Sequence, residues 1–330
     1  MSEFTQDKAV FTNNAANSKD DSLFYFIDKN SIEAEKITAP RYSYWRSVFR
    51  VFFKKKVNFV LIGLLLLIFL AAFVIPAFAP YAPYENVTDA TSFNLSPAKA
   101  INKYGFSLKY LLGTGGMGNS ILYGICSSAR TSLMLAVICA AINMTIGIIL
   151  GAVWGYSKRF DQFMLVIYNI LANVPYILMI SVLVYIIGSG FWSFVFALTV
   201  TGWLGISYFF RTQVMIIRDR EYSLASRCLG TPIPRMITKN ILPFLTSVTV
   251  TLLATELPSY ISMEVFLSYI GVGLSANVPS LGRMIQEAQS AFMIYPWEFW
   301  PPVAVAAAIT IILYVLGQNL ADATDPRTHM

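Results

Sequence analysis

Six long apolar runs constrain the fold of this 330-residue chain more than any other feature. Each has about the length, roughly 20 residues, that an α-helix needs to cross the hydrocarbon core of a bilayer. Backbone polar groups find no water in lipid, and the runs lack the alternation of barrel strands, so helices are the expected structure. We therefore predict an all-α, polytopic membrane protein with six transmembrane helices, over residues 57–79, 131–155, 163–187, 191–210, 244–270 and 301–321.

Composition agrees with this fold class. The chain is 56% hydrophobic and only 13% charged, whereas a soluble domain has roughly a quarter charged residues. Soluble classes of protein are therefore excluded.

Positive charges indicate which segments face the cytoplasm. Arg46, Arg50 and the run Lys54–Lys56 precede the first apolar run without an acidic residue among them. Such a run also occurs in nucleic-acid-binding segments, but here it is typical of the cytoplasmic flank of a membrane helix. The basic segments 156–162 and 211–243 belong on the same side, and the uncharged link 188–190 belongs outside. Six spans with both termini in the cytoplasm satisfy all of these expectations, and we expect no nucleic-acid partner.

The spans divide the chain into five expected parts. They are a cytoplasmic tail over 1–53 that ends in an interfacial helix of basic and aromatic residues, a first transmembrane helix over 54–79, an extracytoplasmic segment over 80–130, a core of five transmembrane helices over 131–322 with a cytoplasmic loop at 211–243, and a cytoplasmic tail over 323–330.

The residues needed for catalysis or metal binding are missing from the sequence. It has one histidine, His329, and three cysteines without metal-ligand spacing. The glycine-rich stretch 113–118 lacks the Gly-Lys-Ser/Thr ending of a phosphate loop. We therefore expect no catalytic residue, metal or cofactor on this chain. A six-span protein without chemistry of its own is most simply a passage for a solute, and a membrane enzyme is a weaker alternative.

Four polar side chains within the apolar runs are candidates for lining such a passage. Asn169 and Asn173 precede Pro175, which can kink the third span. Glu256 and Glu264 lie on either side of a proline in the fifth span, and a carboxyl inside a membrane usually marks a functional surface. Counted from residue 244, Glu256 is about 18 Å deep and Glu264 about 30 Å, near the outer interface. The alternatives are a structural hydrogen bond for Glu256 and snorkelling for Glu264.

Small residues recur at helical spacing in the second span. Gly147, Gly151 and Gly155 are four residues apart, so they share one face of a helix. In lipid, such a face lets a neighbouring helix approach closely. We therefore expect this face to pack against another span.

The segment 221–243 is a polar and basic island between two apolar runs. Two helix-forming halves flank Gly230-Thr231-Pro232. Glycine permits a sharp turn and proline presets the next dihedral angle, so a helix–turn–helix at the membrane surface is predicted. Such a structure is typical of a docking surface for another protein, and the alternative is an ordinary interfacial loop without a partner.

The island resembles the cytoplasmic EAA loop of ABC importer permeases. That pattern is E-A-A, three residues, G, nine residues, then I-x-L-P. Leu224-Ala225-Ser226 takes the place of the triplet, Gly230 that of the glycine and Leu242-Pro243 that of the ending, while Asn240 replaces the isoleucine. The acidic residue comes earlier, at Glu221, as in the peptide and nickel branch of the family.

Three further stretches resemble that branch. Leu112-Gly113-Thr114 is similar to the start of its L-G-T-D-x-x-G-R-D motif, 264–273 to its E-A-A-L-S-F-L-G-L-G segment, and 317–327 to a shortened form of its C-terminal tail. The resemblance covers about residues 50–327 and is strongest to the C-subunit permeases of oligopeptide and dipeptide importers.

The resemblance implies a fold, partners and a set of contact residues. The fold is the transmembrane domain of a type I ABC importer, in a bacterial cytoplasmic membrane. A second permease would complete a heterodimeric pore, two ABC ATPase subunits would carry ATP and Mg, and an extracytoplasmic substrate-binding protein would deliver peptide. The residues implied in coupling to the ATPases are Glu221, Tyr222, Ala225, Arg227, Leu229, Gly230, Thr231, Pro232, Arg235, Leu242 and Pro243.

Within that loop we expect Leu229, Ile233 and Met236 to fill a groove on the ATPase. Two alternatives to a peptide importer stay open. One is an ion-coupled secondary carrier, and the other, within the family, is a permease for nickel or another small solute.

Overall fold

The computed structural model describes residues 43–81 and 88–325, and in them all regular elements are helical. Most of the predicted tail 1–53, His329 and the end of the tail 323–330 lie outside the described residues. Five helical segments are long and apolar enough to span a bilayer, and a bent pair of helices provides a sixth. The expected all-α, six-span architecture is thus confirmed, with one span broken. The five segments are Lys56–Phe78, Ile121–Tyr156, Phe191–Arg218, Ile233–Tyr269 and Pro296–Thr324.

The broken span is the third. Helices α6 (Lys158–Ala172) and α7 (Tyr176–Ile187) meet at 79°, so the single helix predicted over 163–187 is wrong. Pro175 lies at the break, where its ring disfavours a helical conformation of the residue before it and its nitrogen donates no hydrogen bond. The kink expected there is therefore a sharp bend.

Two other spans differ in extent from the prediction. Helix α5 (Ile121–Tyr156) begins about ten residues before the predicted start at 131. The Ser120 hydroxyl caps it by accepting a hydrogen bond from the N–H of Tyr123 at 3.2 Å. Buried small and polar residues in the first turns, such as Ser128, lower the hydropathy there and conceal the helix. The fourth span consists of α8 (Phe191–Thr199) and α9 (Trp203–Arg218), with an interruption at 200–202.

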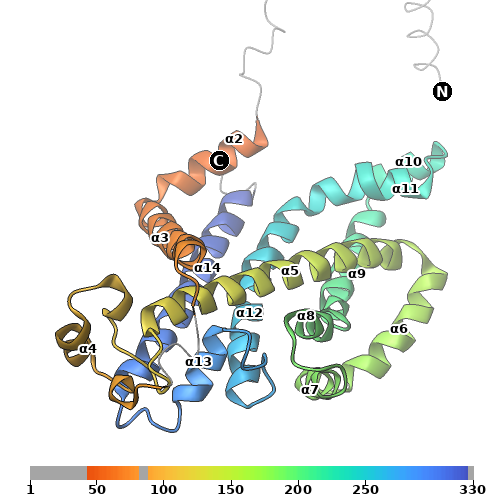
Figure 1. The fold of residues 1–330 in the computed structure, drawn as a ribbon. Helices are drawn as coiled ribbons and strands as arrows, with labels where there is room; N and C mark the ends of the chain where they lie inside the picture. Colours follow the sequence, from red (N-terminus) through yellow and green to blue (C-terminus); the bar gives the residue numbers. More distant parts are fainter. Residues whose placement is uncertain (1–42, 82–87, 326–330) are drawn as a thin grey trace, which may run out of the picture. The chain divides into compact units, whose positions relative to one another are not determined.

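Helix α5 runs through the molecule and packs against α9 (Figure 1). A Cβ atom on Gly147 would lie 2.5 Å from Ile206, one on Gly151 2.6 Å from Phe210, and one on Gly155 2.6 Å from a backbone oxygen of α9. The glycine face predicted for close helix packing is therefore confirmed. It places the backbones of α5 and α9 in direct contact.

The N-terminal helix α2 (Tyr44–Lys54) packs on the end of α14 (Pro296–Thr324). Val48 and Phe52 are buried against it, and the Tyr44 hydroxyl donates to the carbonyl of Thr324 at 2.8 Å. Helix α3 (Lys56–Phe78) follows directly. The helix predicted in this basic and aromatic stretch is present, and its location at a membrane surface stays a prediction.

The C-terminal motif contributes to the same junction. Asn319 accepts a hydrogen bond from Lys55 at 2.7 Å and donates one to the buried Asn58 at 2.7 Å. The amide of Asn58 in turn donates to the carbonyl of Phe52 at 2.7 Å. These bonds join α2, α3 and α14.

The segment between the first two spans contains α4 (Pro97–Tyr104) and two short 3-10 turns. Thr114, from the Leu-Gly-Thr motif, is buried, and its hydroxyl donates to the carbonyl of Ser92 at 2.6 Å. Lys103 bonds Asp89 at 2.8 Å and holds the pKa of that carboxyl well below its usual range. The Leu-Gly-Thr motif thus bonds the end of this segment to the turn at Ser92.

Candidate functional site

The island 221–243 forms a hairpin of helices at one end of the molecule. Figure 1 shows α10 (Glu221–Cys228) and α11 (Ile233–Arg235) at the same end as α2 and the C-terminal end of α14, with α4 at the opposite end. The chain then continues through the π-helix η6 (Met236–Ile241) and the turn η7 (Leu242–Leu245) into α12 (Thr246–Tyr269). We call residues 221–243 the surface hairpin.

Gly230 makes the turn of the surface hairpin. Its φ angle is +74°, in the left-handed region. Its N–H donates to the carbonyl of Arg227 at 3.0 Å, and the N–H of Thr231 donates to that of Ser226 at 3.2 Å. This pair of bonds is the Schellman motif, in which a glycine closes a helix C-terminus. The predicted helix–turn–helix is therefore present.

Apolar side chains are exposed on the protein surface at the tip of the surface hairpin. Leu229 is 86% exposed and Ile233 is 53% exposed. Most of the other residues proposed for coupling are exposed as well, and Thr231 and Leu242 are partly covered. Arg227 and Arg235 lie on either side of the turn. Such a cluster of exposed apolar residues with a basic rim is typical of a protein contact.

Met236 does not belong to this exposed set. It is 0% exposed and packs in a core cluster with Phe210, Val214 and Ile241. The expectation that it fills a groove on a partner is therefore wrong. The wider turn of η6 directs Met236 and Ile241, five residues apart, to the same inner side.

A hydrogen bond joins the two arms of the surface hairpin. The Asn240 amide donates to the Ser226 hydroxyl at 2.9 Å, and that hydroxyl donates to the carbonyl of Tyr222 at 3.0 Å. Ser226 and Asn240 are two of the positions at which the sequence departs from the EAA pattern. The two departures therefore compensate each other, because one polar replacement supplies the partner of the other.

We expect Asn240→Ala to destabilise the surface hairpin by about 0.5–1.5 kcal/mol, the net value of one hydrogen bond. Ser226→Ala should cost more, because it also removes the bond to the carbonyl of Tyr222. The double variant should lose little more than Ser226→Ala alone, because that change already removes the bond between the two side chains. Thermal unfolding of the purified protein in detergent measures this, with Lys239→Ala as the exposed control. Fully additive losses would show that the two side chains act independently.

The base of the surface hairpin is fixed to the membrane helices. Arg218, at the end of α9, donates to the carbonyl of Gly155 in α5 at 2.9 Å and pairs with Asp219 at 2.9 Å. That guanidinium lowers the pKa of Asp219. The Ser223 hydroxyl in α10 donates to the carbonyl of Ile217 at 2.9 Å. These bonds join α10 to α9, and α9 to the end of α5.

An ionic contact supports the same region. Arg211 of α9 forms a bidentate pair with Asp161 of α6. Asp161 also accepts a hydrogen bond from the indole N–H of Trp154 at 2.7 Å. Helices α5, α6 and α9 are thus joined next to the hairpin.

A cavity of about 460 Å³ lies where the broken helices meet. Residues of the α6–α7 bend, of the α8–α9 interruption and of α12 line it. Glu256, Thr201 and three tyrosines, Tyr168, Tyr176 and Tyr260, are its polar lining residues besides Ser259. Its size is within the range of small-molecule sites. We call it the central cavity.

Side-chain hydrogen bonds pair a backbone carbonyl at the interruption between α8 and α9, next to this cavity. Leu198 lies in the last turn of α8, where backbone carbonyls have no partner within the helix. Its carbonyl accepts bonds from the Tyr176 hydroxyl at 2.8 Å and from the Asn143 amide at 3.3 Å. The same amide donates to the hydroxyl of Tyr260 at 2.6 Å. These contacts stabilise a break that would be costly in lipid.

The four predicted passage residues have different positions. Glu256 lines the central cavity. Asn169 and Asn173 are exposed, bond to each other through side chain and backbone, and are not among its lining residues. Sequence reasoning missed Tyr176 and Thr201, for which the available signal was a polar group within an apolar run. Assignment of any of these residues to a passage stays a prediction.

Glu264 is buried rather than at an interface. It is 0% exposed and accepts hydrogen bonds from Ser132 of α5 at 2.9 Å and from Ser268 at 3.0 Å. Ser132 also accepts a bond from the N–H of Leu281, at the start of α13 (Leu281–Ala288). The snorkelling alternative is therefore wrong. Glu264 joins α5, α12 and α13, away from the residues that line the central cavity.

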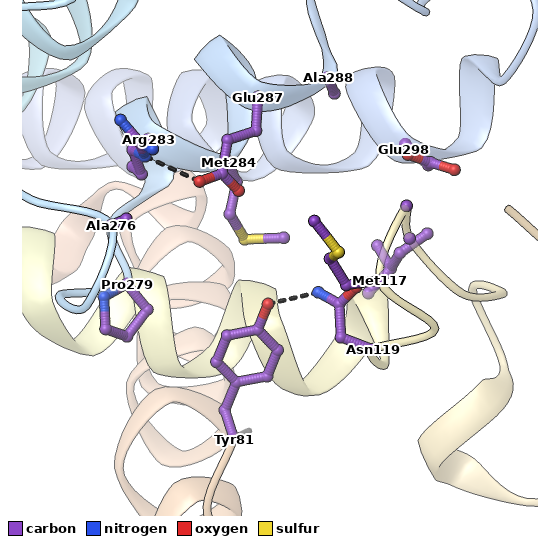
Figure 2. Close-up of a pocket in the computed structure, with 13 residues that line it drawn as sticks. Tyr81, Met117, Asn119, Ala276, Pro279, Arg283, Met284, Glu287, Ala288 and Glu298 are labelled. Carbon is purple, nitrogen blue, oxygen red and sulfur yellow. Dashed lines mark hydrogen bonds and ion pairs between the residues drawn. The ribbon is translucent and has the colours of Figure 1, made fainter. Parts of the chain in front are cut away.

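A second cavity, of about 430 Å³, lies between α13 and the segment before α5. Figure 2 shows Arg283 and Glu287 of α13 on one side of it, and Tyr81 and Asn119 on the other. Arg283 and Glu287 form an ion pair at 2.7 Å, and Asn119 donates to the hydroxyl of Tyr81. Helix α13, which supplies several of its lining residues, lies toward the end of the molecule opposite the surface hairpin (Figure 1).

Comparison with known proteins connects these features to a family. The family described as "Binding-protein-dependent transport system inner membrane component" matches residues 143–330, which contain the surface hairpin and the lining residues of the central cavity. The chain belongs to this family. A second family, the N-terminal transmembrane domain of oligopeptide transport permease C, matches residues 43–97. The permease is thus a multi-pass membrane protein with the type I ABC importer fold, and it is a transport subunit rather than an enzyme.

Individual relatives extend over nearly the whole permease. The oligopeptide transport system permease protein AmiD of Streptococcus pneumoniae is 42% identical over 94% of this chain and 98% of its own length. OppC of Bacillus subtilis, an oligopeptide permease, is 31% identical over 93% and 97%, and its dipeptide permease DppC is 31% identical over 94% and 94%. The resemblance found in the sequence is confirmed, and an ion-coupled carrier finds no support in these matches.

Proposed function

We propose that this permease is one half of the pore of an ATP-driven importer of oligopeptides or dipeptides in a bacterial cytoplasmic membrane. The observation that carries the proposal is the exposed apolar tip of the surface hairpin, in a chain of the binding-protein-dependent family. The names of the relatives, oligopeptide and dipeptide permeases, favour peptides over nickel or another small solute.

Three kinds of partner complete the proposed importer. A second permease supplies the other half of the pore, two ABC ATPases bind ATP and Mg at the cytoplasmic side, and an extracytoplasmic binding protein delivers the peptide. The surface hairpin, α2 and the end of α14 occupy one end of the molecule (Figure 1). The basic residues of α2 and of the surface hairpin support a cytoplasmic position for that end, with both termini inside.

The surface hairpin is the proposed contact with the ATPase. Burial of a leucine side chain contributes about 1.5–3 kcal/mol, so Leu229 and Ile233 can supply much of the energy of docking. Arg227 and Arg235 then lie at the rim, where charges affect orientation and specificity more than affinity.

The hairpin also offers a route from the ATPase to the pore. Arg218 and Ser223 fix α10 to α9 and α5, and α9 begins at the interruption that borders the central cavity. Closure of the ATPases would move the hairpin as a rigid unit, and α9 would move with it. Rigid-body movement of packed helices is a common way to switch between two states.

Leu229→Asp tests the docking role. Loss of one buried leucine weakens binding by about 10- to 100-fold, so we expect the ATPase subunits to be lost on purification and labelled-peptide uptake to fall accordingly. Leu229 is exposed, so the thermal midpoint of the permease should not change. The matched control is Leu108→Asp, an exposed leucine in the segment with α4.

Two results would contradict the proposal. Retention of the ATPases and full uptake in Leu229→Asp would remove the hairpin as the docking surface. Uptake that needs no ATPase subunit and is stopped by a proton ionophore would identify an ion-coupled carrier instead.

A further inference from the structure

Among the residues that line the central cavity, one has a carboxyl group and none has a basic side chain. Glu256 is half-buried in α12, and none of the residues that line the cavity is a lysine, arginine or histidine. A carboxyl at membrane depth is costly and is usually retained for a function. The Glu264 carboxyl is fully buried among the serine hydroxyls that bond it, whereas Glu256 is partly exposed to the cavity, next to Tyr260. Glu256 therefore has the position of a group that serves a ligand.

Two buried polar atoms next to the cavity have no hydrogen-bond partner within the described residues. Thr201 is a lining residue and is 9% exposed, but its hydroxyl oxygen is covered by protein and makes no hydrogen bond. The side-chain oxygen of Asn143, next to Tyr260, is also buried and unpaired. Buried polar atoms in native proteins nearly always have a partner. The Thr201 oxygen, left unpaired beside the cavity, is therefore available to a ligand once a small movement of the α8–α9 interruption uncovers it.

The chemistry of the wall favours a cation of the ammonium type. A carboxylate pairs with the charge, hydroxyl oxygens accept its N–H groups, and the faces of Tyr168, Tyr176 and Tyr260 attract cations. A hard metal ion fits poorly, because Ca²⁺ and Mg²⁺ take six or more oxygen ligands, several of them carboxylates or waters. An ammonium group needs only three acceptors.

The cavity also lies where the helices can rearrange. It is bordered by the 79° bend of α6 and α7 and by the interruption of α8 and α9, and Pro258 interrupts the hydrogen bonding of α12 two residues after Glu256. Transporters commonly bind substrate at such discontinuous helices. A ligand bound there would be released when α9 moves.

We infer that the central cavity binds an ammonium group of the peptide as it passes through the pore, with Glu256 as the counter-ion and Thr201 as a hydrogen-bond acceptor. This inference rests on the proposed function, since it takes a peptide as cargo. The ammonium is the α-amino group, which every unmodified peptide carries, or a lysine side chain.

The test is a cycle of one protein change and one ligand change. The complete permease–ATPase complex, purified without the binding protein, is titrated with tri-alanine, with N-acetyl-tri-alanine and with N-acetyl-dialanyl-lysine, all three with a free carboxyl terminus, and binding is followed by calorimetry. For tri-alanine we expect Glu256→Gln to raise Kd at least about tenfold. Acetylation should do the same with the wild-type protein. Combined, the two changes should raise Kd no further than either alone, because both remove one ion pair.

The comparison of the three peptides shows whether the cavity recognises the α-amino group or a lysine side chain. If the lysine peptide binds the wild type as tri-alanine does, any ammonium is accepted. If it binds as weakly as N-acetyl-tri-alanine, the α-amino group alone is recognised. Glu287→Gln, at the second cavity, is the control and should leave every Kd unchanged. Thr201→Val should raise Kd for tri-alanine by a smaller factor, about threefold to tenfold, as expected for one hydrogen bond.

The proposal is overturned if acetylation leaves the Kd of the wild type unchanged, or if the effects of acetylation and Glu256→Gln multiply. The acetylation arm uses unaltered protein, so it decides the matter even if Glu256→Gln does not fold. ATP-dependent uptake of tri-alanine by the wild-type importer is measured in parallel. Its presence together with a negative cycle refutes only the ammonium site, and its absence refutes the proposed function itself.

Discussion

Gly151→Leu is expected to prevent the membrane domain from assembling. A Cβ at this position would already lie 2.6 Å from the Cβ of Phe210 and 2.6 Å from the carbonyl oxygen of Ser207. The second contact is with backbone, so no side-chain rotation relieves it. A leucine adds three further carbons, and α5 and α9 must separate along the whole glycine face.

The expected cost exceeds ordinary overpacking. Extra methylene groups in a packed core cost about 1–3 kcal/mol when neighbouring side chains can adjust, and here a backbone must move. A native domain has only about 5–15 kcal/mol of stability. Separation of α5 from α9 also breaks the bond from Arg218 to the carbonyl of Gly155. We therefore expect little folded protein by fluorescence size-exclusion chromatography, and no uptake.

Gly63→Leu is the matched control. Gly63 lies within α3, and a Cβ there would meet no atom within 4 Å. The same substitution in another membrane helix should therefore leave accumulation and unfolding temperature close to those of the wild type. Normal accumulation of Gly151→Leu would contradict the close packing of α5 on α9. Failure of both variants would point to a general effect of leucine on insertion.

The sequence predicts the spans best where hydropathy is continuous. Helices α3 and α14 include the predicted runs 57–79 and 301–321 with small differences at the ends. The bend at Pro175 was not predictable in size, because a proline within an apolar run is compatible with a mild kink or with a complete break of the helix. The burial of Glu264 could not be predicted for a different reason. Counting residues gives depth along a helix, but not the partners that reach it from α5 and α13.

The surface hairpin was predictable because its signals are local. Gly230 and Pro232 fix a turn through their own dihedral angles, whatever lies around them. Met236 was misplaced because an apolar side chain next to the turn can face a partner or the core, and the sequence does not show the π-helix that directs it to the core. The central cavity depends on the meeting of three separate spans, so Tyr176 and Thr201 could not be joined to Glu256 from sequence spacing alone.

Gly230→Pro is expected to abolish transport and leave the membrane domain intact. Proline fixes φ near −65°, whereas Gly230 has φ +74°. The substitution also removes the N–H that bonds to the carbonyl of Arg227 at 3.0 Å. The Schellman motif cannot form, so α10 loses its end and Leu229 changes direction.

The change should be confined to the tip of the surface hairpin. A Cβ on Gly230 would meet no atom within 4 Å, so nothing else in the permease resists the substitution. We expect normal insertion and an unfolding temperature close to that of the wild type. Peptide uptake into proteoliposomes should fall to background, and peptide should no longer stimulate ATP hydrolysis.

Gly230→Asn distinguishes the effect of the backbone conformation at this position from the effect of adding a side chain. Asparagine adopts left-handed angles more readily than most residues, and it retains the N–H. Uptake should therefore stay within a few fold of the wild type. If uptake is lost equally in both variants, the left-handed turn is not what matters at Gly230. The position would instead have to lack a side chain, for example because the partner approaches it closely. Full uptake in Gly230→Pro would separate the surface hairpin from energy coupling, because no ATPase could act through a turn that is no longer there.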